Sequence, residues 1–254
     1  MIELTDVSGG YRGKKRVFDV TVEFTRGSVT CVLGTNGSGK STLIKLSCGL
    51  LPLISGIVSV DGVKLSAMSR KAIAQKIAYL PQERDIPDIT AEKLVMHGRF
   101  PHLGYPRIYS EREKAITCEA MKTAGILHLR SEYLSDMSGG ERQKTYMAMM
   151  IAQDTDAVFL DEPTTYLDIA RQIDIADIVK TLRQTNKAVI MASHDINLAL
   201  SGADKIILMK EGRILAATSP DLALESGALE ETFGVKALSL TDETGHTHYV
   251  FARK

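Results

Sequence analysis

The stretch Gly34-Thr35-Asn36-Gly37-Ser38-Gly39-Lys40-Ser41-Thr42 decides the fold, because it follows the pattern G-x-x-x-x-G-K-[ST]. Its glycines allow successive backbone N–H groups to curl around an anion, and a β-branched side chain at Gly37 or Gly39 is expected to strain the loop or block a phosphate. Lys40 supplies a positive charge for β- and γ-phosphates, and Ser41 offers a hydroxyl to Mg²⁺. The stretch therefore predicts a site for a nucleoside triphosphate.

The flanking sequence provides the context that this loop requires. Residues 29–33, Val-Thr-Cys-Val-Leu, form a short apolar run typical of a buried strand. Residues 42–48 are expected to form a helix whose N-terminus faces the phosphates. An ordinary glycine-rich turn is the alternative, but strand, loop, Lys40 and Ser41 are all in register. Many unrelated NTPases share this loop, so the rest of the chain must indicate which kind this is.

Length and charge limit the possible classes. The 254 residues are enough for one large α/β domain, or for one with an inserted subdomain. Lys plus Arg (31) equals Asp plus Glu (31), which gives no overall electrostatic case for nucleic acid. Cys31, Cys48 and Cys118 lack metal-ligand spacing and are expected to be reduced and packed. No signal peptide and no apolar run of about 18 residues is apparent, so we expect a cytoplasmic chain that reaches a membrane only through a partner.

An antiparallel β layer is predicted in the first part of the chain. Residues 2–7 suggest an edge strand, residues 20–24 a half-buried strand, and Asp61-Gly62 the turn of a hairpin. Residues 77–80 suggest a further strand that ends just before Gln82. Tyr11 is either a packed aromatic residue or a flat surface on which an adenine ring could stack.

Residues 88–154 have a helical pattern and are predicted to form an inserted α-helical subdomain. Residues 1–87 and 155–254 would then form the nucleotide-binding core with its β subdomain. Within the helical block, residues 99–106 are not expected to be helical, because they contain two prolines and a glycine. Ser110 and Glu113 form a capping box for the next helix, which ends near Gly125.

The segment Ser138-Gly139-Gly140-Glu141 allows two interpretations. Ser138 and Glu141 form a capping box, so the segment could simply begin a helix. Tandem glycines weaken an ordinary helix start. Together with a hydroxyl and a helix N-terminus they favour a second anion site, and we expect that function.

Polar groups follow two apolar strands. Residues 157–160 lead into Asp161-Glu162, and two carboxylates there are costly unless they have a function. Asp161 suits Mg²⁺ coordination and Glu162 suits a base that polarises water. His194 follows the strand 188–192; a lone histidine there usually caps or packs, but its place at the same sheet edge favours a functional role.

The remaining chain is predicted to complete the domain. Ile169, Ile173, Ala176 and Val179 form an apolar helical stripe, and residues 206–217 suggest a β-hairpin. A short helix begins near Pro220 and a last strand covers 236–240. His246 and His248 are expected to lie in a solvated tail rather than in a metal site.

Together these motifs resemble the ATP-binding cassette (ABC) ATPases over nearly the whole chain. The matching positions are Tyr11 for the adenine-stacking aromatic, Gly34 to Thr42 for the Walker A loop, Gln82 for the Q-loop, Ser138 to Glu141 after Met137 for the signature, Asp161 with Glu162 for Walker B and the catalytic glutamate, Asp168 for the D-loop and His194 for the switch histidine. The resemblance implies a P-loop α/β fold: a mixed core sheet, an antiparallel β subdomain and an inserted α-helical subdomain.

The resemblance also implies a mechanism. Two copies form a head-to-tail homodimer with ATP at the interface, where Ser138–Glu141 of one copy face the Walker A loop of the other. Lys40 and the loop bind ATP; Ser41, Gln82 and Asp161 hold Mg²⁺; Glu162 and His194 act in hydrolysis.

Two short segments, of which the one at 165–169 departs from the commoner Ser-Ala-Leu-Asp, suggest a subgroup. Residues 165–169, Thr-Tyr-Leu-Asp-Ile, and residues 98–104, Gly-Arg-Phe-Pro-His-Leu-Gly, resemble cassettes that power import of iron–siderophore complexes, haem or cobalamin. The partners implied are membrane permease subunits and, indirectly, a substrate-binding protein, with the chain at the cytoplasmic face of the membrane. Residues 100–106 are expected to receive a permease helix, with Arg99 among the residues that matter for coupling.

Three alternative functions fit the sequence less well than that of an importer ATPase. A soluble ABC ATPase acting on nucleic acid or ribosomes usually carries two cassettes or a long coiled-coil insertion. Exporter cassettes are often fused to membrane helices, which the sequence lacks. A non-hydrolytic scaffold is disfavoured by the intact Glu162 and His194.

Overall fold

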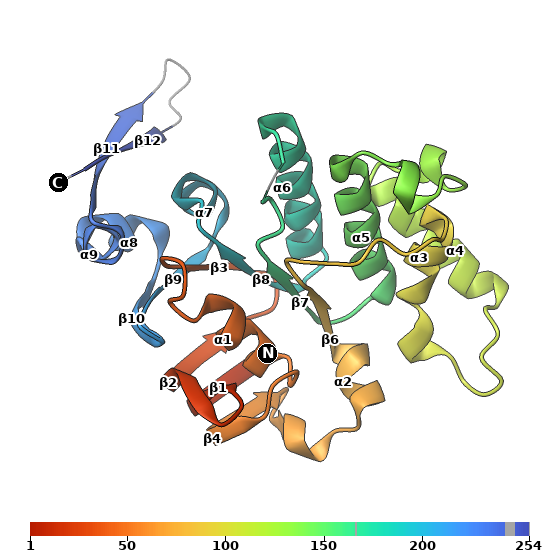
Figure 1. Cartoon of the computed structure of the whole chain (residues 1–254), viewed down its shortest axis with the longest axis horizontal. Helices are drawn as coiled ribbons and strands as arrows, with labels where there is room; N and C mark the ends of the chain where they lie inside the picture. The colour runs from red at the N-terminus through yellow and green to blue at the C-terminus, as the bar shows by residue number, and fades with distance from the viewer. Residues whose placement is uncertain (166, 242–246, 254) are drawn as a thin grey trace.

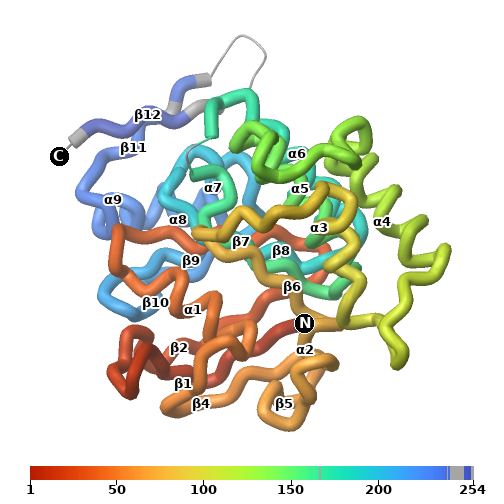
Figure 2. The backbone as a smooth tube through the Cα atoms, turned by 45° about the vertical axis from the view of Figure 1, so that its right-hand side comes forward, coloured from red at the N-terminus to blue at the C-terminus, as the bar shows by residue number. Residues whose placement is uncertain are grey.

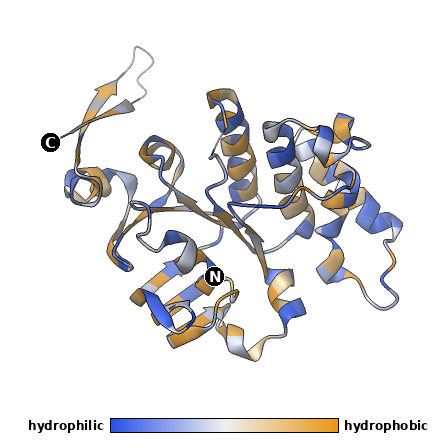
Figure 3. Ribbon diagram, in the orientation of Figure 1, coloured by the Kyte–Doolittle hydropathy of each residue, from blue (hydrophilic) through white to orange (hydrophobic). Residues whose placement is uncertain are grey.

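The computed structural model describes residues 1–165, 167–241 and 247–253, which are organised around a six-stranded mixed sheet of order β10-β9-β3-β8-β7-β6 (Figure 1). Its strands are β3 (Val29–Leu33), β6 (Ile77–Leu80), β7 (Ala157–Asp161), β8 (Ala188–Ser193), β9 (Lys205–Lys210) and β10 (Arg213–Thr218). All neighbours pair in parallel except β9 and β10. Every residue of β3, β7 and β8 is buried, as their apolar sequences predict, and Figure 3 shows these central strands as mostly hydrophobic.

A second, antiparallel sheet has the order β2-β1-β4-β5 and comprises β1 (Ile2–Tyr11), β2 (Lys14–Phe24), β4 (Leu53–Val60) and β5 (Val63–Lys64). The prediction that residues 2–7 form an edge strand is wrong, since β1 pairs with both β2 and β4. Register shifts along β1 break its alternation, which explains the weak signal in the sequence. The hairpin turn at Asp61-Gly62 is confirmed, with φ of 50° and 78°.

Helix α1 (Lys40–Ser47) joins these two sheets. Leu43 and Ile44 belong to the same buried cluster as residues from β1, β2 and β4 on one side and from β7 and β8 on the other. In that cluster Phe24 and Phe159 pack edge to face with ring centroids 5.7 Å apart. The position of the phosphate-binding loop is therefore fixed by a continuous core that lies directly beneath it.

Helices cover the opposite face of the core sheet, and α3, α4 and α5, which come between β6 and β7 in the sequence, gather at one side of the sheet (Figures 1 and 2). The helices in this part are α3 (Ala91–His97), α4 (Glu111–Thr123), α5 (Gly139–Gln153), α6 (Ile169–Gln184) and α7 (Ile196–Gly202), whereas α2 (Arg70–Lys76) lies on the side of the antiparallel sheet, where Ile73 packs against the cluster that contains α1. Single 3₁₀ turns lie at Leu65–Ala67, Phe100–His102, Leu127–Leu129 and Leu134–Asp136. The capping boxes of α4 and α5 are confirmed. The expectation of no helix over 99–106 is wrong for one 3₁₀ turn, which tolerates Pro101 near its start.

The apolar stripe predicted for α6 does not face the core along its whole length. Ile169 and Ile173 are 76% and 58% exposed, whereas Ile175, Ile178 and Leu182 are buried. The buried face is set by contact with the core sheet and α5, and it is rotated from the stripe that residue spacing alone selected.

The chain ends in α8 (Pro220–Glu225), α9 (Ala228–Phe233) and a hairpin of β11 (Val235–Thr241) and β12 (Thr247–Arg253). The prediction of a last strand over 236–240 is confirmed by β11. The expectation of a solvated tail around His246 and His248 missed β12. His248 lies in β12 opposite Leu240, while His246 lies outside the described residues. Tyr249 and Phe251 pack against the core, which explains why this segment is ordered as a strand. Across the described ranges, we find no helix with both the length and the apolar character needed to cross a bilayer.

Candidate functional site

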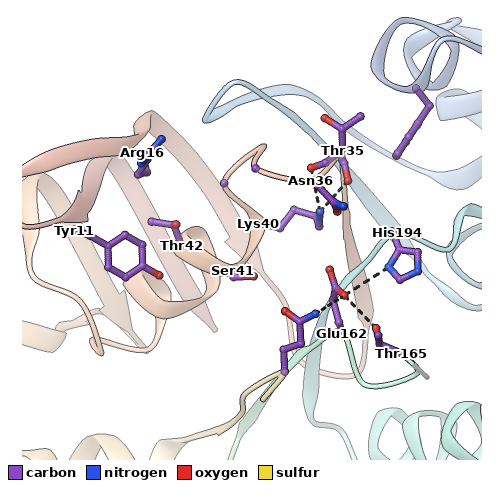
Figure 4. Close-up of a pocket in the computed structure, with 15 residues that line it drawn as sticks. Tyr11, Arg16, Thr35, Asn36, Lys40, Ser41, Thr42, Glu162, Thr165 and His194 are labelled. Carbon is purple, nitrogen blue, oxygen red and sulfur yellow. Dashed lines mark hydrogen bonds and ion pairs between the residues drawn. The ribbon is translucent and has the colours of Figure 1, made fainter. Parts of the chain in front are cut away.

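A cavity of about 1010 Å³ lies beyond the carboxyl ends of β3, β7 and β8 (Figure 4). Its lining includes residues that the sequence singled out, namely Tyr11, Gly34, Thr35, Asn36, Gly37, Gly39, Lys40, Ser41, Thr42, Gln82, Glu162 and His194. Arg16, Thr165 and Phe233 also line it and were not predicted, because they come from β2, the segment after β7 and α9. The edge of an α/β sheet where the carboxyl ends of its strands meet is the usual ligand site of such folds.

The phosphate-binding loop depends on its glycines in two different ways. Gly37 and Gly39 have φ of 78° and 104°, which favours glycine at both positions. A Cβ on Gly39 would lie 3.2 Å from the carbonyl oxygen of Arg16, whereas a Cβ on Gly37 would meet nothing within 4 Å. Backbone conformation thus constrains Gly37, and both conformation and space constrain Gly39.

Lys40 lies inside the loop rather than extending into solvent. Its Nζ donates to the carbonyl oxygens of Gly34 at 2.8 Å and Thr35 at 3.3 Å. The side chain is only 5% exposed, and this burial lowers the pKa of Lys40, an effect that the charges of Glu162 and Asp161 oppose. A buried ammonium group held by neutral carbonyls is well placed to bind an anionic phosphate.

Two further features of the loop fit a phosphate ligand. The Oγ of Ser38 is buried and has no hydrogen-bond partner among the described residues. Helix α1 begins after Gly39 without a side-chain cap, so its first N–H groups are directed at the loop's interior. An anion in the cradle would satisfy both kinds of donor.

A cluster of oxygen atoms below the loop fits Mg²⁺. Asp161 is 3% exposed, and its Oδ1 accepts from Ser41 Oγ at 2.8 Å while its Oδ2 accepts from Tyr79 OH at 3.3 Å. Burial raises the pKa of Asp161, and the hydrogen bonds from Ser41 and Tyr79 oppose this rise. Hydroxyl and carboxylate oxygens are the donors that Mg²⁺ prefers. Tyr79 was missed because a tyrosine in a strand is usually only a packing residue.

Glu162 is held from three directions (Figure 4). Its Oε2 accepts from Gln82 Nε2 at 2.9 Å and Thr165 Oγ1 at 3.0 Å, and lies 3.6 Å from His194 Nδ1. The backbone of Glu162 has a φ of 50°, and its N–H donates to Ala192 O at 3.0 Å. A positive φ is uncommon for a residue with a side chain, and such strain often accompanies function.

The segment Ser138–Glu141 does not line this cavity. Ser138 Oγ donates to Glu141 Oε2 at 2.7 Å and accepts from the backbone N–H of Glu141 at 3.3 Å, which forms an exposed capping box at the start of α5. Asp168 likewise caps α6 by accepting from the N–H of Arg171 at 2.9 Å. The side chain of Arg171 lies over Gly140, where an added Cβ would approach it to 2.9 Å. The two predicted phosphate-binding segments are therefore separate within one chain.

Comparison with known proteins decides the family. A family model described as ABC transporter matches residues 17–165, more than half of the chain. The chain belongs to the ABC transporter family. It is 36% identical over 245 residues to the ferric enterobactin transport ATP-binding protein FepC of Escherichia coli (strain K12), covering 95% of this chain and 90% of FepC. It is 35% identical over 240 residues to the achromobactin transport ATP-binding protein CbrD of Dickeya dadantii (strain 3937), covering 94% and 89%.

Solved structures agree on the fold. A protein described as a metal-chelate type ABC transporter, in an inward-facing conformation, superposes with a TM-score of 0.87 over 100% of this chain and 98% of that one. At 24% identity this likeness concerns the fold alone. The ABC ATPase fold predicted from the motifs is thus confirmed, and the chain is an ATP-binding cassette ATPase.

Proposed function

We propose that this ABC ATPase is the ATP-hydrolysing subunit of an importer for iron–siderophore complexes. The observation that carries this proposal is its identity of 35% and 36%, over nearly its full length, to relatives named for achromobactin and ferric enterobactin transport. The segments 98–104 and 165–169 support the same subgroup, although Tyr166 lies outside the described residues.

The cavity would bind ATP with Mg²⁺. Tyr11, 42% exposed at one end of the cavity, would stack on the adenine ring. Lys40 and the N–H groups of the loop would bind the β- and γ-phosphates. Ser41, Gln82 and Asp161 would hold Mg²⁺, which when bound neutralises charge on the phosphates.

Hydrolysis requires a group that orients and deprotonates water. Glu162 suits this role, because Gln82, Thr165 and His194 fix its carboxylate at the cavity wall. His194 is 59% exposed there and could also stabilise charge on the γ-phosphoryl group.

A homodimer would complete the site. In one chain Ser138–Glu141 lie outside the cavity, although they combine a hydroxyl, two glycines and the N-terminus of the 15-residue helix α5. A two-fold, head-to-tail arrangement would bring this segment of each copy to the ATP held by the other. The D-loop residue Asp168 caps α6, whose Arg171 lies over Gly140, and the D-loop would lie at the same junction.

The transporter's permease subunits would bind the surface around 100–108, at the cytoplasmic face of the membrane, with a substrate-binding protein acting on its other side. Phe100, Tyr105 and Ile108 are 46%, 99% and 70% exposed, so their apolar side chains are available to a partner helix. Arg99 does not belong to it: the expectation that it is a coupling residue is corrected by its 5% exposure and its 2.7 Å hydrogen bond to Ala152 O.

Reconstitution tests the substrate and the class together. The chain, its cognate permease and the binding protein are assembled in vesicles with ATP inside or outside, and uptake of ferric siderophores, haem and cobalamin is compared. ATP-dependent uptake of a ferric siderophore, abolished by Lys40→Ala, is expected. Uptake of haem or cobalamin alone would move the substrate assignment to those alternatives. A chain that binds no permease, yet hydrolyses ATP, would instead be a soluble ABC ATPase.

A further inference from the structure

Gln143 on α5 joins the two segments that position Glu162. Its side chain is 6% exposed, and its Nε2 donates to the carbonyl oxygen of Pro163 at 2.6 Å. Its Oε1 accepts a hydrogen bond from Arg84 Nη2. Pro163 directly follows Glu162, and Arg84 lies two residues after Gln82. The amide nitrogen of Gln143 therefore bonds the segment that contains Glu162, and its amide oxygen bonds the segment that contains Gln82.

These contacts close a ring. From Gln82 the path runs through a 2.9 Å hydrogen bond to Glu162, along the backbone to Pro163, through Gln143 to Arg84, and back along the backbone to Gln82. Three segments far apart in the chain meet in it: the end of β6, the end of β7 and the first half of α5. Displacing α5 relative to β7 would move the carbonyl of Pro163 or break its hydrogen bond.

The next turn of α5 strengthens the link to the Gln82 segment. Tyr146 follows Gln143 by three residues and so lies on the same face of the helix. The guanidinium of Arg84 stacks on the Tyr146 ring, with Cζ 4.4 Å from the ring centroid. The hydroxyl of Tyr146 donates to Asp85 O at 2.8 Å. Gln143 and Tyr146 thus hold Arg84 and Asp85 together against α5.

The arrangement is costly if its role is only structural. Arg84 is buried enough to lower its pKa, and its Nη1 is buried without a hydrogen-bond partner among the described residues. Burying a cation with an unmet N–H costs free energy, and an apolar side chain could fill the same space. Such a cost is expected where the relative positions of these segments, rather than the stability of the fold, must be maintained.

We propose that Gln143 is a positioning residue that sets Glu162 and Gln82 according to the position of α5. Ser138–Glu141 form the N-cap and the first turn of α5. A phosphate bound there that shifts α5 would therefore change the position of Glu162 through this ring. This last step rests on the proposed function, in which that phosphate belongs to ATP held by a second copy. The ring itself rests only on the contacts within one chain.

Two substitutions distinguish the contribution of the amide nitrogen of Gln143 from that of its amide oxygen. Gln143→Glu keeps an acceptor for Arg84 but removes the donor to Pro163, whereas Gln143→Ala removes both. The matched control is Gln153→Ala near the end of the same helix, where Gln153 Nε2 donates to Ala74 O at 2.8 Å and makes no contact with the ring. Thermal unfolding of all three variants shows how much stability each loses.

Steady-state ATPase activity and amide hydrogen exchange of the full-length chain test the inference. Both Gln143 variants should lower kcat about tenfold, the effect of one lost positioning hydrogen bond, with KM for ATP within about twofold. Exchange should rise at 162–165 in both variants, and at 82–86 only in Gln143→Ala. Gln153→Ala should change neither kcat nor exchange in these segments.

The outcomes are distinguishable from failure of the proposed function. Normal kcat and normal exchange in Gln143→Glu would overturn the positioning role even if the wild-type chain hydrolyses ATP and Lys40→Ala does not. A wild-type chain without ATPase activity would contradict the proposed function. In that case the exchange measurement still decides the ring: increased exchange at 162–165 supports it, and unchanged exchange overturns it.

Discussion

Gln82 and Glu162 are joined by a 2.9 Å hydrogen bond although 80 residues separate them in the sequence. The contact exists because β6 and β7 are parallel neighbours, so the residues that follow them leave the sheet at the same edge. The intervening residues 88–154 include α3, α4 and α5. The contact between the ends of β6 and β7 therefore lies where the chain leaves the sheet toward those helices, whereas the chain rejoins the sheet at the other end of β7.

Replacing Glu162 tests its role as the base. Glu162→Gln keeps the size of the side chain and its acceptor for Gln82 but removes the carboxylate. We expect ATP binding to persist and turnover to fall about 100-fold or more, as for loss of a general base. The variant should also form a stable dimer with ATP, measured by light scattering. Full turnover in Glu162→Gln would contradict the assignment; Glu83→Gln, a nearby exposed glutamate, is the control.

Tyr79 should matter for Mg²⁺ although it lies below the cavity. Tyr79→Phe removes the hydroxyl that bonds Asp161 Oδ2 and keeps the ring. Loss of a group that orients a metal ligand typically costs about tenfold in metal affinity. We expect the Mg²⁺ concentration for half-maximal ATPase activity to rise about tenfold.

The same substitution has a pH signature. The hydrogen bond from Tyr79 lowers the pKa of Asp161, so its loss should raise that pKa and move the acidic limb of the activity profile to higher pH. Tyr133→Phe, at an exposed tyrosine, should leave both measurements unchanged. An unaltered Mg²⁺ dependence in Tyr79→Phe would show that Asp161 needs no support from it.

Substitution of Arg99 should reduce the stability of the fold, whereas substitution of Tyr105 should leave it almost unchanged. Arg99→Ala leaves a buried carbonyl at Ala152 without its donor and removes buried packing, so we expect a loss of about 2 kcal/mol in the free energy of unfolding. Tyr105→Ala, at a side chain 99% exposed, should change stability by no more than about 0.5 kcal/mol. Urea unfolding measures both.

Tyr105→Ala should instead lower transport in the reconstituted system while basal ATPase activity of the isolated chain persists. A parallel fall of transport and basal activity, or no effect on either, would exclude this surface as the permease contact. A stable Arg99→Ala protein would show that its hydrogen bond contributes little.

A charge network at Asp61 should make stability depend on acidic pH. Hydrogen bonds from the N-terminal amine at 2.7 Å and from Arg26 at 3.0 Å lower the pKa of Asp61 from 3.8 to about 2. Because the folded pKa lies below the unfolded one, the stabilisation is complete above about pH 4 and is lost as pH falls toward 2. Asp61 is 34% exposed, so screening reduces the effect to about 1 kcal/mol.

The comparison is between wild type and Asp61→Asn. Wild type should be more stable by about 1 kcal/mol at pH 7, and this difference should shrink between pH 4 and pH 2. Asp88→Asn at an exposed site is the control. A difference that stays constant down to pH 2 would mean that the ion pairs contribute nothing specific.

Features encoded by short stretches of sequence were predictable. The phosphate-binding loop, the two capping boxes and the turn at Asp61-Gly62 each need only a few adjacent residues, and the structure has all of them. The carboxyl ends of parallel strands also meet at one sheet edge, so the apolar runs before Asp161-Glu162 and before His194 were enough to bring Glu162 and His194 to one cavity.

Features that depend on distant partners were not predictable. Whether β1 is an edge strand depends on its pairing with β4, and the buried face of α6 depends on what packs against it. Arg99 is buried because the end of α5 supplies a carbonyl to it, which no local pattern reveals. Tyr79 and Gln143 gain significance only from contacts with residues that are 82 and 20 positions away.

Mixing two inactive variants tests the central claim that ATP is hydrolysed at sites shared by two copies. Lys40→Ala disables the phosphate-binding loop, and Ser138→Arg blocks the segment proposed to act on the other copy's ATP. Each variant alone should be inactive. A mixed dimer keeps one site with an intact Lys40 from one copy and an intact Ser138 from the other. The account predicts that mixing equal amounts restores ATPase activity to as much as about a quarter of wild type, since half of the dimers carry one intact site of two. No recovery from two folded variants that form mixed dimers, or full activity of Ser138→Arg alone, would contradict it.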